Sequence, residues 1–301
     1  MATLASVIVC LPASEALRSF VQTSSNANQI PERLVQLAVA ARTDTGMIRS
    51  GNEDSFFAEP RNGQLAVEGG LFVVADGMGG HAAGEVASEM AVELLSRSLA
   101  GVRDLRTDGA TTEVSEALKR ANRAVYDRTI SEVEKQGMGT TASVLIVAGG
   151  RYLIGQVGDS RIYLLRNGDL KQITKDHSYV QEQVDAGVLT PEQARYHPYS
   201  NVITRCVGAS ADVEPDTYEG DIKTGDLFLI ASDGLTGMVD DRRLLRLLSS
   251  RATPQRLVEA LISEANGRGG LDNITAIVVQ VISLDDPPRD AITKETTPHR
   301  P

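Results

Sequence analysis

The chain has 301 residues, of which 42% are hydrophobic and 23% are charged, so it is long enough to bury a sizeable core. Its 40 acidic residues outnumber 30 Lys and Arg, which gives a net charge of −10 at pH 7. This acidic balance argues against binding to nucleic acid, which requires clustered Lys and Arg against the phosphates. No apolar run reaches the roughly 18 residues that span a bilayer, so we expect no membrane insertion.

Cysteine is almost absent, with Cys10 and Cys206 the only two in the chain. This usage leaves no disulfide framework and is typical of a reducing compartment, so we expect a cytoplasmic location. Neither cysteine has an Arg six positions later, which excludes the Cys-x5-Arg loop of thiolate phosphatases. The apolar stretch 4–11 is not preceded by the basic residues of a signal peptide. We therefore interpret residues 1–33 as an unprocessed, partly disordered extension.

From residue 34 onward the hydrophobic pattern predicts blocks of strands and blocks of helices. We expect strands over 34–41, 71–75, 142–148, 152–157, 161–165, 226–231 and 273–282. We expect helices over 82–99, 113–133, 240–249 and 254–266. Asn167-Gly168 between two apolar runs predicts a tight hairpin. The polar stretch 176–198 predicts short helical pieces, with Pro191 at the first position of one of them.

The order of these elements indicates the fold class. Strands and helices do not alternate regularly, which favours an α+β fold with antiparallel sheets over a doubly wound parallel sheet. We expect one main domain over 34–284. The segment 285–301 contains four prolines and is expected to be a disordered tail.

Acidic residues fall beside the predicted buried strands. Asp76-Gly77 follows one strand, Asp233-Gly234 follows another, and Asp272 precedes the last, while Glu53-Asp54 lies upstream. An Asp-Gly pair alone is usually a turn, because both residues tolerate the required dihedral angles. Several carboxylates converging at the rim of a core, however, repel one another unless a cation neutralises them. Hard divalent cations prefer such all-oxygen sites.

Six ordered motifs surround these carboxylates. They are Gly46-Met47-Ile48-Arg49-Ser50-Gly51-Asn52-Glu53-Asp54, Val74-Ala75-Asp76-Gly77-Met78-Gly79-Gly80-His81, Gly139-Thr140-Thr141, Val157-Gly158-Asp159-Ser160-Arg161, Ala231-Ser232-Asp233-Gly234-Leu235 and Asp272-Asn273-Ile274-Thr275. In this order and at these separations they closely resemble the motifs of the PPM family of metal-dependent Ser/Thr protein phosphatases, also called type 2C. The bacterial branch is the nearest match, and the resemblance covers about 38–281.

The resemblance implies a four-layer α-β-β-α sandwich, in which helices flank two antiparallel sheets and the range 34–284 is the catalytic domain. It also implies two Mn²⁺ or Mg²⁺ ions at one edge of the sandwich. Carried over by position, Asp76 would bridge both metals, and Asp233 and Asp272 would hold the first. Glu53 and the backbone carbonyl of Gly77 would hold the second, partly through water.

The remaining roles are carried over in the same way. Asp54 would hydrogen-bond metal-bound waters, and Asp159 matches the position that, with Asp233, holds a third and weaker metal in bacterial members. Two cations about 3.5–4 Å apart stabilise in-line displacement at phosphorus and acidify the bridging water that attacks it. Arg49 would bind the substrate phosphate, because its planar fork can donate two parallel hydrogen bonds. The expected catalytic residues are Arg49, Asp54 and Asp76.

One position departs from part of the family. Some eukaryotic members have a His directly after the Asp-Gly pair, proposed to protonate the leaving alkoxide, and here that position is Met78. His81 lies three residues later, where a first-turn residue of the helix 82–99 is the simpler interpretation. The leaving-group acid therefore stays open.

The stretch 176–198 resembles the mobile flap beside the bacterial active site, and it buries little apolar area, so we expect low local stability.

The expected function is hydrolysis of phosphoserine and phosphothreonine in proteins, including a Ser/Thr kinase that the enzyme opposes. One alternative is a catalytically inactive PPM-like module that binds phosphoproteins. Such a module is expected to lack a metal carboxylate, whereas Glu53, Asp76, Asp233 and Asp272 are all present. Another is a phosphatase restricted to one partner, which the motifs do not exclude. Nothing in the sequence demands more than a monomer.

Overall fold

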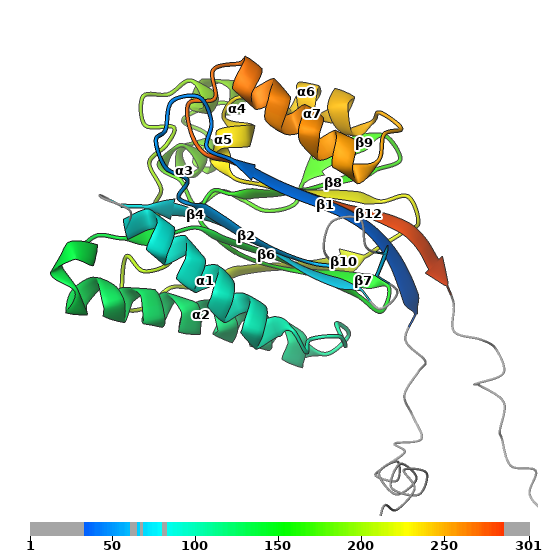
Figure 1. Ribbon diagram of the computed structural model, residues 1–301, viewed down its shortest axis with the longest axis horizontal. Coiled ribbons are helices and arrows are strands. Elements are labelled where there is room, and N and C mark those ends of the chain that lie inside the picture. The colour runs from blue at the N-terminus through cyan, green and yellow to red at the C-terminus, as the bar shows by residue number, and fades with distance from the viewer. Residues whose placement is uncertain (1–32, 61–64, 67–68, 80–82, 286–301) are drawn as a thin grey trace, which may run out of the picture.

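The computed structural model describes residues 33–60, 65–66, 69–79 and 83–285 (Figure 1). The predicted extension 1–33 lies outside these residues apart from Arg33, and so does the predicted tail apart from Asp285. Asp285 belongs to the last strand rather than to the tail, because it pairs with Leu34 at the end of the longest strand ladder.

The described strands form two antiparallel sheets. One has the order β3-β1-β12-β11-β8-β9, with bounds β3 (Leu65–Ala66), β1 (Leu34–Asp44), β12 (Ile274–Asp285), β11 (Leu227–Ala231), β8 (Arg161–Arg166) and β9 (Asp169–Gln172). The other has the order β10-β7-β6-β4-β2, with bounds β10 (Asp216–Asp221), β7 (Arg151–Val157), β6 (Ala142–Ala148), β4 (Gly70–Met78) and β2 (Asp54–Glu59). A short strand, β5 (Gly139–Thr140), pairs with β4.

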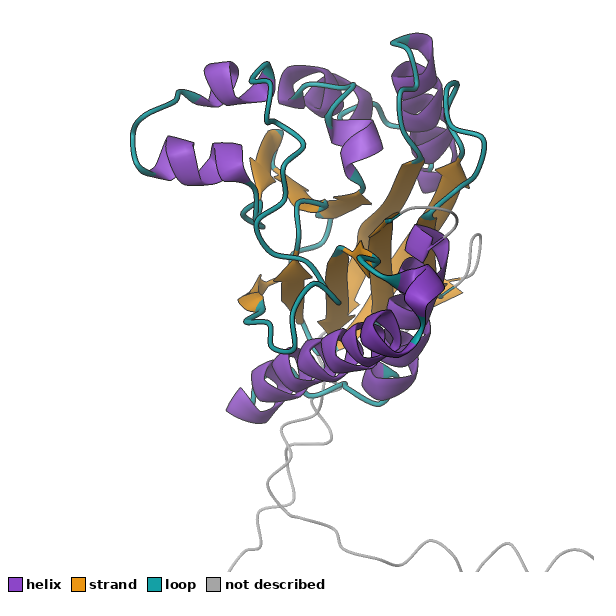
Figure 2. Ribbon diagram, turned by 90° about the vertical axis from the view of Figure 1, so that its left-hand side faces the viewer, coloured by secondary structure: helices purple, strands orange, loops and turns teal. Residues whose placement is uncertain are grey.

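Helices cover the outer face of each sheet, as Figures 1 and 2 show. The second sheet is covered by α1 (Ala83–Leu99) and α2 (Asp108–Ser131), and the first by α6 (Asp241–Leu248) and α7 (Pro254–Gly267). The shorter helices are η1 (Val133–Lys135), α3 (Tyr179–Asp185), α4 (Pro191–Arg195) and α5 (Asp233–Thr236). The arrangement is the predicted four-layer α-β-β-α sandwich, so the fold class is confirmed.

The buried residues alternate between three hydrophobic layers. In β4, Leu71 and Val73 pack under α1 and α2, whereas Phe72 and Val74 pack between the two sheets. A central strand of this kind is buried on both faces, so it reads as a continuous apolar run. In β12, Val278 likewise packs under α7 while its neighbours on either side face the other sheet.

The element boundaries follow the sequence pattern where one face is strongly apolar. The turn at Asn167-Gly168 has positive φ at both residues, 53° and 83°, as the predicted hairpin requires. The helix predicted over 113–133 begins five residues earlier, at Asp108. Strands β2 and β10 were not predicted, because most of their residues are only half-buried and show no clear alternation.

Among the described residues, no helix has both the length and the apolarity to cross a membrane.

The strand registers bring the motifs that contain the predicted carboxylates to one end of the sandwich. Asp44 at the end of β1 is opposite Ile274 at the start of β12, and Ala231 at the end of β11 is opposite Arg161 at the start of β8. In the other sheet Asp54 at the start of β2 is opposite Asp76 near the end of β4. The strand ends and the connecting segments that carry the predicted site residues therefore lie at this end of both sheets.

Candidate active site

Two predicted site residues lie opposite each other on neighbouring strands. Asp54 and Asp76 are register partners in the antiparallel pair of β2 and β4, so their Cβ atoms stand about 4.5–5.5 Å apart. The predicted strand 71–75 is too short, since β4 continues through Asp76 to Met78. It continues because β5 supplies a hydrogen-bonding partner there. Asp76 is thus fixed inside a strand rather than placed in a turn.

Gly77 allows three segments to meet beside Asp76. Its N–H donates to the carbonyl of Glu53 at 3.1 Å. A Cβ at this position would collide with the carbonyl oxygen of Gly84 in the first turn of α1 and would lie 2.6 Å from the Glu53 carbonyl oxygen. The absence of a side chain at Gly77 therefore brings Glu53 and the start of α1 against this strand.

Arg49 and Asp272 lie on two loops that run side by side. The Arg49 guanidinium donates to the Asp272 carboxylate at 2.8 Å, and the two side chains are 50% and 37% exposed. The carboxylate of Asp272 raises the pKa of Arg49, with Glu53 and Asp76 acting in the same direction. A half-exposed guanidinium among carboxylates is accessible to a phosphate, provided that it can leave Asp272.

Asp54 is buried and has one oxygen without a partner. Its Oδ2 accepts hydrogen bonds from the Ser232 hydroxyl at 2.8 Å and the Thr275 hydroxyl at 2.6 Å, whereas its Oδ1 is buried and accepts none. Burial raises the pKa of Asp54 to about 7. An orphaned buried carboxylate oxygen beside Asp76 is unfavourable unless a further donor or a cation meets it.

Asp76, Asp159 and Asp233 are close enough to perturb one another. Burial is the first cause that raises the pKa of each. For Asp76 the second cause is repulsion from Asp54, followed by Asp233, Asp159 and Asp272. Asp233 and Asp76 are also close enough for one carboxyl group, when protonated, to donate a hydrogen bond to the other. The structure therefore brings together every carboxylate that was predicted to hold metal, with Glu53 at the margin of the group, where it is close to Arg49 and Asp272.

The donor chemistry of this group suits hard divalent cations. In the part of the chain that the structure describes, no group of three or more His, Cys, Asp or Glu side chains is already arranged to hold a metal ion. Instead the Asp76 and Asp233 side chains lie within hydrogen-bond reach of each other, and Asp272 pairs with Arg49. Clustered carboxylates with raised pKa values and an unpartnered oxygen are the features that a divalent cation would relieve. The residues present therefore fit such an ion.

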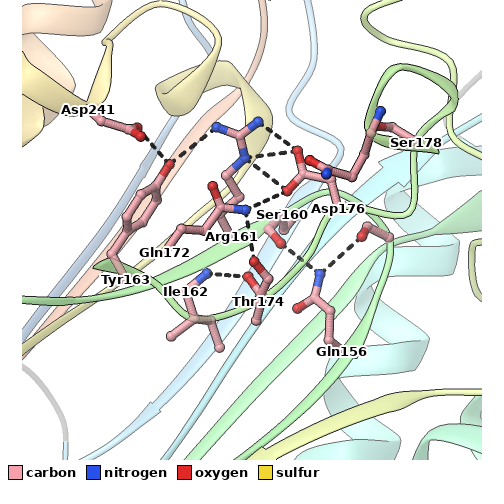
Figure 3. A network of polar contacts seen from close by, with 12 residues as sticks. Gln156, Ser160, Arg161, Ile162, Tyr163, Gln172, Thr174, Asp176, Ser178 and Asp241 are labelled. Atoms are coloured by element: carbon pink, nitrogen blue, oxygen red, sulfur yellow. Dashed lines mark hydrogen bonds and ion pairs between the residues drawn. The ribbon is translucent and has the colours of Figure 1, made fainter. Parts of the chain in front are cut away.

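The predicted flap segment 176–198 is anchored to the loop that carries Asp159. The Arg161 guanidinium donates to the Asp176 carboxylate through Nε, at 3.0 and 2.9 Å, and through Nη2, at 2.6 Å (Figure 3). The backbone N–H of His177 donates to the Gly158 carbonyl at 3.0 Å, and the Gly158 N–H donates back to His177 Nδ1 at 3.0 Å. The segment itself contains the predicted short helices, α3 and α4, with Pro191 in the first turn of α4.

Sequence reasoning missed the residues that support this site. Ser232 and Thr275 hold Asp54, and Asn273 holds the Arg49 loop through three hydrogen bonds to backbone atoms. All three stand inside the quoted motifs, one to three positions from an acidic residue, and that proximity was the available signal. Met78, which stands where some eukaryotic members have a His, ends β4, and His81, the residue considered in its place, lies outside the described residues.

Comparison with known proteins gives a consistent result. The family model described as protein phosphatase 2C matches residues 48–264. The serine/threonine phosphatase stp of Listeria monocytogenes is 41% identical over 241 residues, which are 79% of this chain and 94% of the relative.

Solved structures agree with the sequence comparison. The catalytic domain of PstP, solved in complex with two manganese ions, is similar with a TM-score of 0.72 and 37% identity, covering 83% of this chain and all of that one. The serine/threonine phosphatase Stp1 of Staphylococcus aureus has a TM-score of 0.78 and 32% identity, covering 85% of this chain and 99% of that one. On these grounds, and in agreement with its motifs, the chain belongs to the protein phosphatase 2C family.

Proposed function

We propose that this protein is a metal-dependent phosphatase that hydrolyses phosphoserine and phosphothreonine in proteins. The observation that carries the proposal is the convergence of Asp76 with Asp54, Asp159, Asp233 and Asp272 at one end of the sandwich. Relatives that are named serine/threonine phosphatases support the reaction class. All the carboxylates that are expected to bind metal are present, which argues against the alternative of a catalytically inactive binding module.

The proposed site would hold two metal ions through different residues. Asp76 would bridge two Mn²⁺ or Mg²⁺ ions, with Asp233 and Asp272 on the first, and with Glu53 and the Gly77 carbonyl on the second. Such ions, when bound, neutralise the carboxylates, polarise the phosphate and lower the pKa of the attacking water.

Three further residues complete the proposed set. Asp54 would hold water through its unpartnered Oδ1, because Ser232 and Thr275 already occupy its other oxygen. Asp159 would hold a third and weaker ion together with Asp233. Arg49 would exchange its bond to Asp272 for two parallel bonds to the substrate phosphate.

The flap and the cellular setting belong to the same proposal. We propose that the flap, 176–198, selects substrates and couples to the third ion, since Arg161 and Asp176 tie its base to the loop of Asp159. Phosphorylated proteins are the proposed partners, including a Ser/Thr kinase whose action the enzyme opposes. A cytoplasmic location is proposed, in keeping with the presence of only two cysteines. A monomer is proposed because nothing in the sequence demands a larger assembly.

The test is hydrolysis of p-nitrophenyl phosphate and of a phosphothreonine peptide with Mn²⁺, with Mg²⁺ and with EDTA. Phosphate release that requires a divalent cation is the expected result. A folded protein that binds the phosphopeptide but releases no phosphate with either metal would instead identify the inactive binding module.

A further inference from the structure

Three exposed apolar side chains lie on the two loops that meet at Arg49. Met47 and Ile48 directly precede Arg49 and are 66% and 68% exposed. Leu271 directly precedes Asp272 and is 56% exposed. We call these three residues the apolar rim. Single exposed apolar residues are ordinary on a protein surface, whereas a group beside a binding side chain is typical of an interaction surface.

Two contacts hold the rim loops together. The Met47 N–H donates to the Gly270 carbonyl at 2.8 Å, one residue before Leu271. The Arg49 guanidinium reaches Asp272 at 2.8 Å, one residue after Leu271. In Figure 1 the blue loop after β1 and the orange loop after α7 run side by side at the same end of the sandwich. The rim residues on both loops therefore lie near Arg49, the proposed phosphate-binding residue.

We infer that the apolar rim binds the residues beside the phosphorylated Ser or Thr and gives the enzyme a preference for substrates with apolar side chains there. This inference rests on the proposed function, because Arg49 must hold the phosphate. An extended chain advances about 3.3–3.6 Å per residue, so the positions next to the phosphoresidue lie within one or two residue lengths of Arg49. The occupant of the rim is thus the flank of the phosphoprotein itself, held in place by its own phosphate.

Charge alone would suggest a preference for different substrate residues beside the phosphorylated Ser or Thr. The chain carries a net charge of −10, and Asp272 and Glu53 lie beside Arg49. These acidic groups would favour Lys or Arg beside the phosphoresidue, whereas the rim favours Leu or Ile. Because surface charge acts at a distance and is screened by salt, contact with the rim should decide the preference at physiological ionic strength.

The experiment uses the full chain with Mn²⁺ and three phosphothreonine peptides of equal length. The peptides differ only in the two residues that flank the phosphothreonine, which are Leu and Ile, Ser and Gln, or Lys and Arg. We expect kcat/KM for the apolar flank to exceed that for the Ser and Gln flank by about 10-fold, the scale of losing a few methylene contacts. The variant Met47→Gln, Ile48→Gln, Leu271→Gln should bring this ratio close to one.

The matched control is Leu34→Gln. Leu34 is 51% exposed and lies at the opposite end of β1, about 33 Å from Asp44 along the strand. It should keep both the activity and the selectivity of the unaltered protein, which separates the rim from exposed apolar residues in general.

The outcomes separate the two proposals. Equal kcat/KM for the apolar and the Ser and Gln flanks, or a clear preference for Lys and Arg, would overturn the rim inference and leave the phosphatase in place. A preference for the apolar flank that survives in the triple variant would also overturn it. Absence of phosphate release from all three peptides would overturn the proposed function, and the rim inference with it.

Discussion

The side-chain carbonyl of Asn273 accepts a hydrogen bond from the backbone N–H of Glu53 at 2.8 Å, across 220 residues of sequence. Its amide nitrogen donates to the carbonyl oxygens of Thr45 and Gly51, at 2.9 Å each. A single buried side chain thus holds both ends of the loop that carries Arg49 and the backbone of a proposed metal ligand. Asn273 therefore positions the loop of Arg49, the proposed phosphate-binding residue, without any need to touch substrate.

The first prediction concerns Asn273→Asp. This change keeps the size and the acceptor that faces Glu53, but it replaces two donated hydrogen bonds by a carboxylate oxygen facing two carbonyls. We expect KM for a phosphopeptide to rise by about 10-fold, because the loop of Arg49 loosens. The free energy of unfolding should fall by about 2–4 kcal/mol, measured by urea denaturation.

Asn122 provides a closely matched control. It is fully buried in α2, donates to the carbonyls of Ser210 and Ala211 at 3.0 and 3.2 Å, and accepts from the Gly208 N–H at 2.7 Å. Asn122→Asp should therefore lose stability similarly while KM stays unchanged. An equal rise of KM in both variants would show that loss of stability, and not the Arg49 loop, is responsible.

The second prediction is that Asp233→Asn reduces turnover by more than about 100-fold at saturating Mn²⁺. Even substitution of residues that only support the metal ligands typically lowers metal affinity or activity by about 10–100-fold. The free energy of unfolding in EDTA is not expected to fall, because the change removes one of several mutually repelling carboxylates. Turnover and urea unfolding are measured on the same sample. Retained turnover at saturating Mn²⁺ would remove Asp233 from the site.

The control for Asp233 is another buried aspartate. Asp226 is 1% exposed and accepts two hydrogen bonds from Arg166, at 2.8 and 2.6 Å. Asp226→Asn should show the opposite result, with about 1–3 kcal/mol less stability and near-normal turnover while folded.

The third prediction concerns Arg49→Ala, which should chiefly raise KM for a phosphopeptide, by about 10-fold or more, as loss of a phosphate clamp does. Arg49→Lys should recover only part of the affinity, because an ammonium group cannot donate two parallel bonds. Steady-state kinetics provide the measurement. Arg42→Ala serves as the control, because Arg42 is similarly exposed, at 49%, and pairs with Asp44 two residues later on the same strand, β1. An unaltered KM for Arg49→Ala would contradict the assignment.

The apolar pattern was sufficient to predict an α+β fold with antiparallel sheets, because the strands that form the core are apolar on both faces, whereas the four layers were implied by the resemblance of the motifs to the PPM family. The runs 71–75 and 226–231 are identified as buried strands for this reason, although β4 extends three residues further, to Met78, and the motifs around them identify the family. The strand β2, which begins at Asp54, was harder to predict from the sequence, because most of its residues are half-buried and show no alternation. Its position becomes evident only from its pairing with β4.

The supporting residues of the site were not predictable in the same way. Asn273 and Glu53 meet only after β1 and β12 pair, and a contact over 220 residues leaves no local pattern. The bond between Arg161 and Asp176 similarly depends on how the segment after β9 returns to the start of β8. Residue type and position in a motif indicated the carboxylates, whereas their partners required the register of the sheets.

The fourth prediction is that Asp176→Asn loosens the flap. The substitution removes the carboxylate that accepts both Arg161 nitrogens and a bond from Gln172 at 2.9 Å. We expect faster limited proteolysis within 179–198, and a larger loss of activity on a phosphothreonine peptide than on p-nitrophenyl phosphate. Asp185→Asn is the control, since Asp185 lies in the same segment but pairs at its surface with Lys175. Equal losses on both substrates would argue against a selecting flap.

The last prediction concerns pH and the metal-free protein. Burial raises the pKa of Asp54 from an ordinary value of 3.8 to about 7 in the folded state. Between these two values the folded state binds more protons than the unfolded state, so the stability that this group contributes is full below about pH 4 and is lost as the pH rises toward 7. In EDTA the free energy of unfolding should therefore fall from pH 5 to pH 8, by on the order of a few kcal/mol.

Urea unfolding at the two pH values measures this slope. Asp54→Asn should flatten it, because the amide oxygen can still accept from Ser232 and Thr275 while no charge develops at the unpartnered Oδ1. Asp76 and Asp159, whose pKa values are also raised, should retain part of the slope in this variant. Addition of Mn²⁺ should restore stability at pH 8 more than at pH 5, because the ionised carboxylates bind the cation. A metal-free protein that is more stable at pH 8 than at pH 5 would mean that these carboxylates are not forced together as the structure places them.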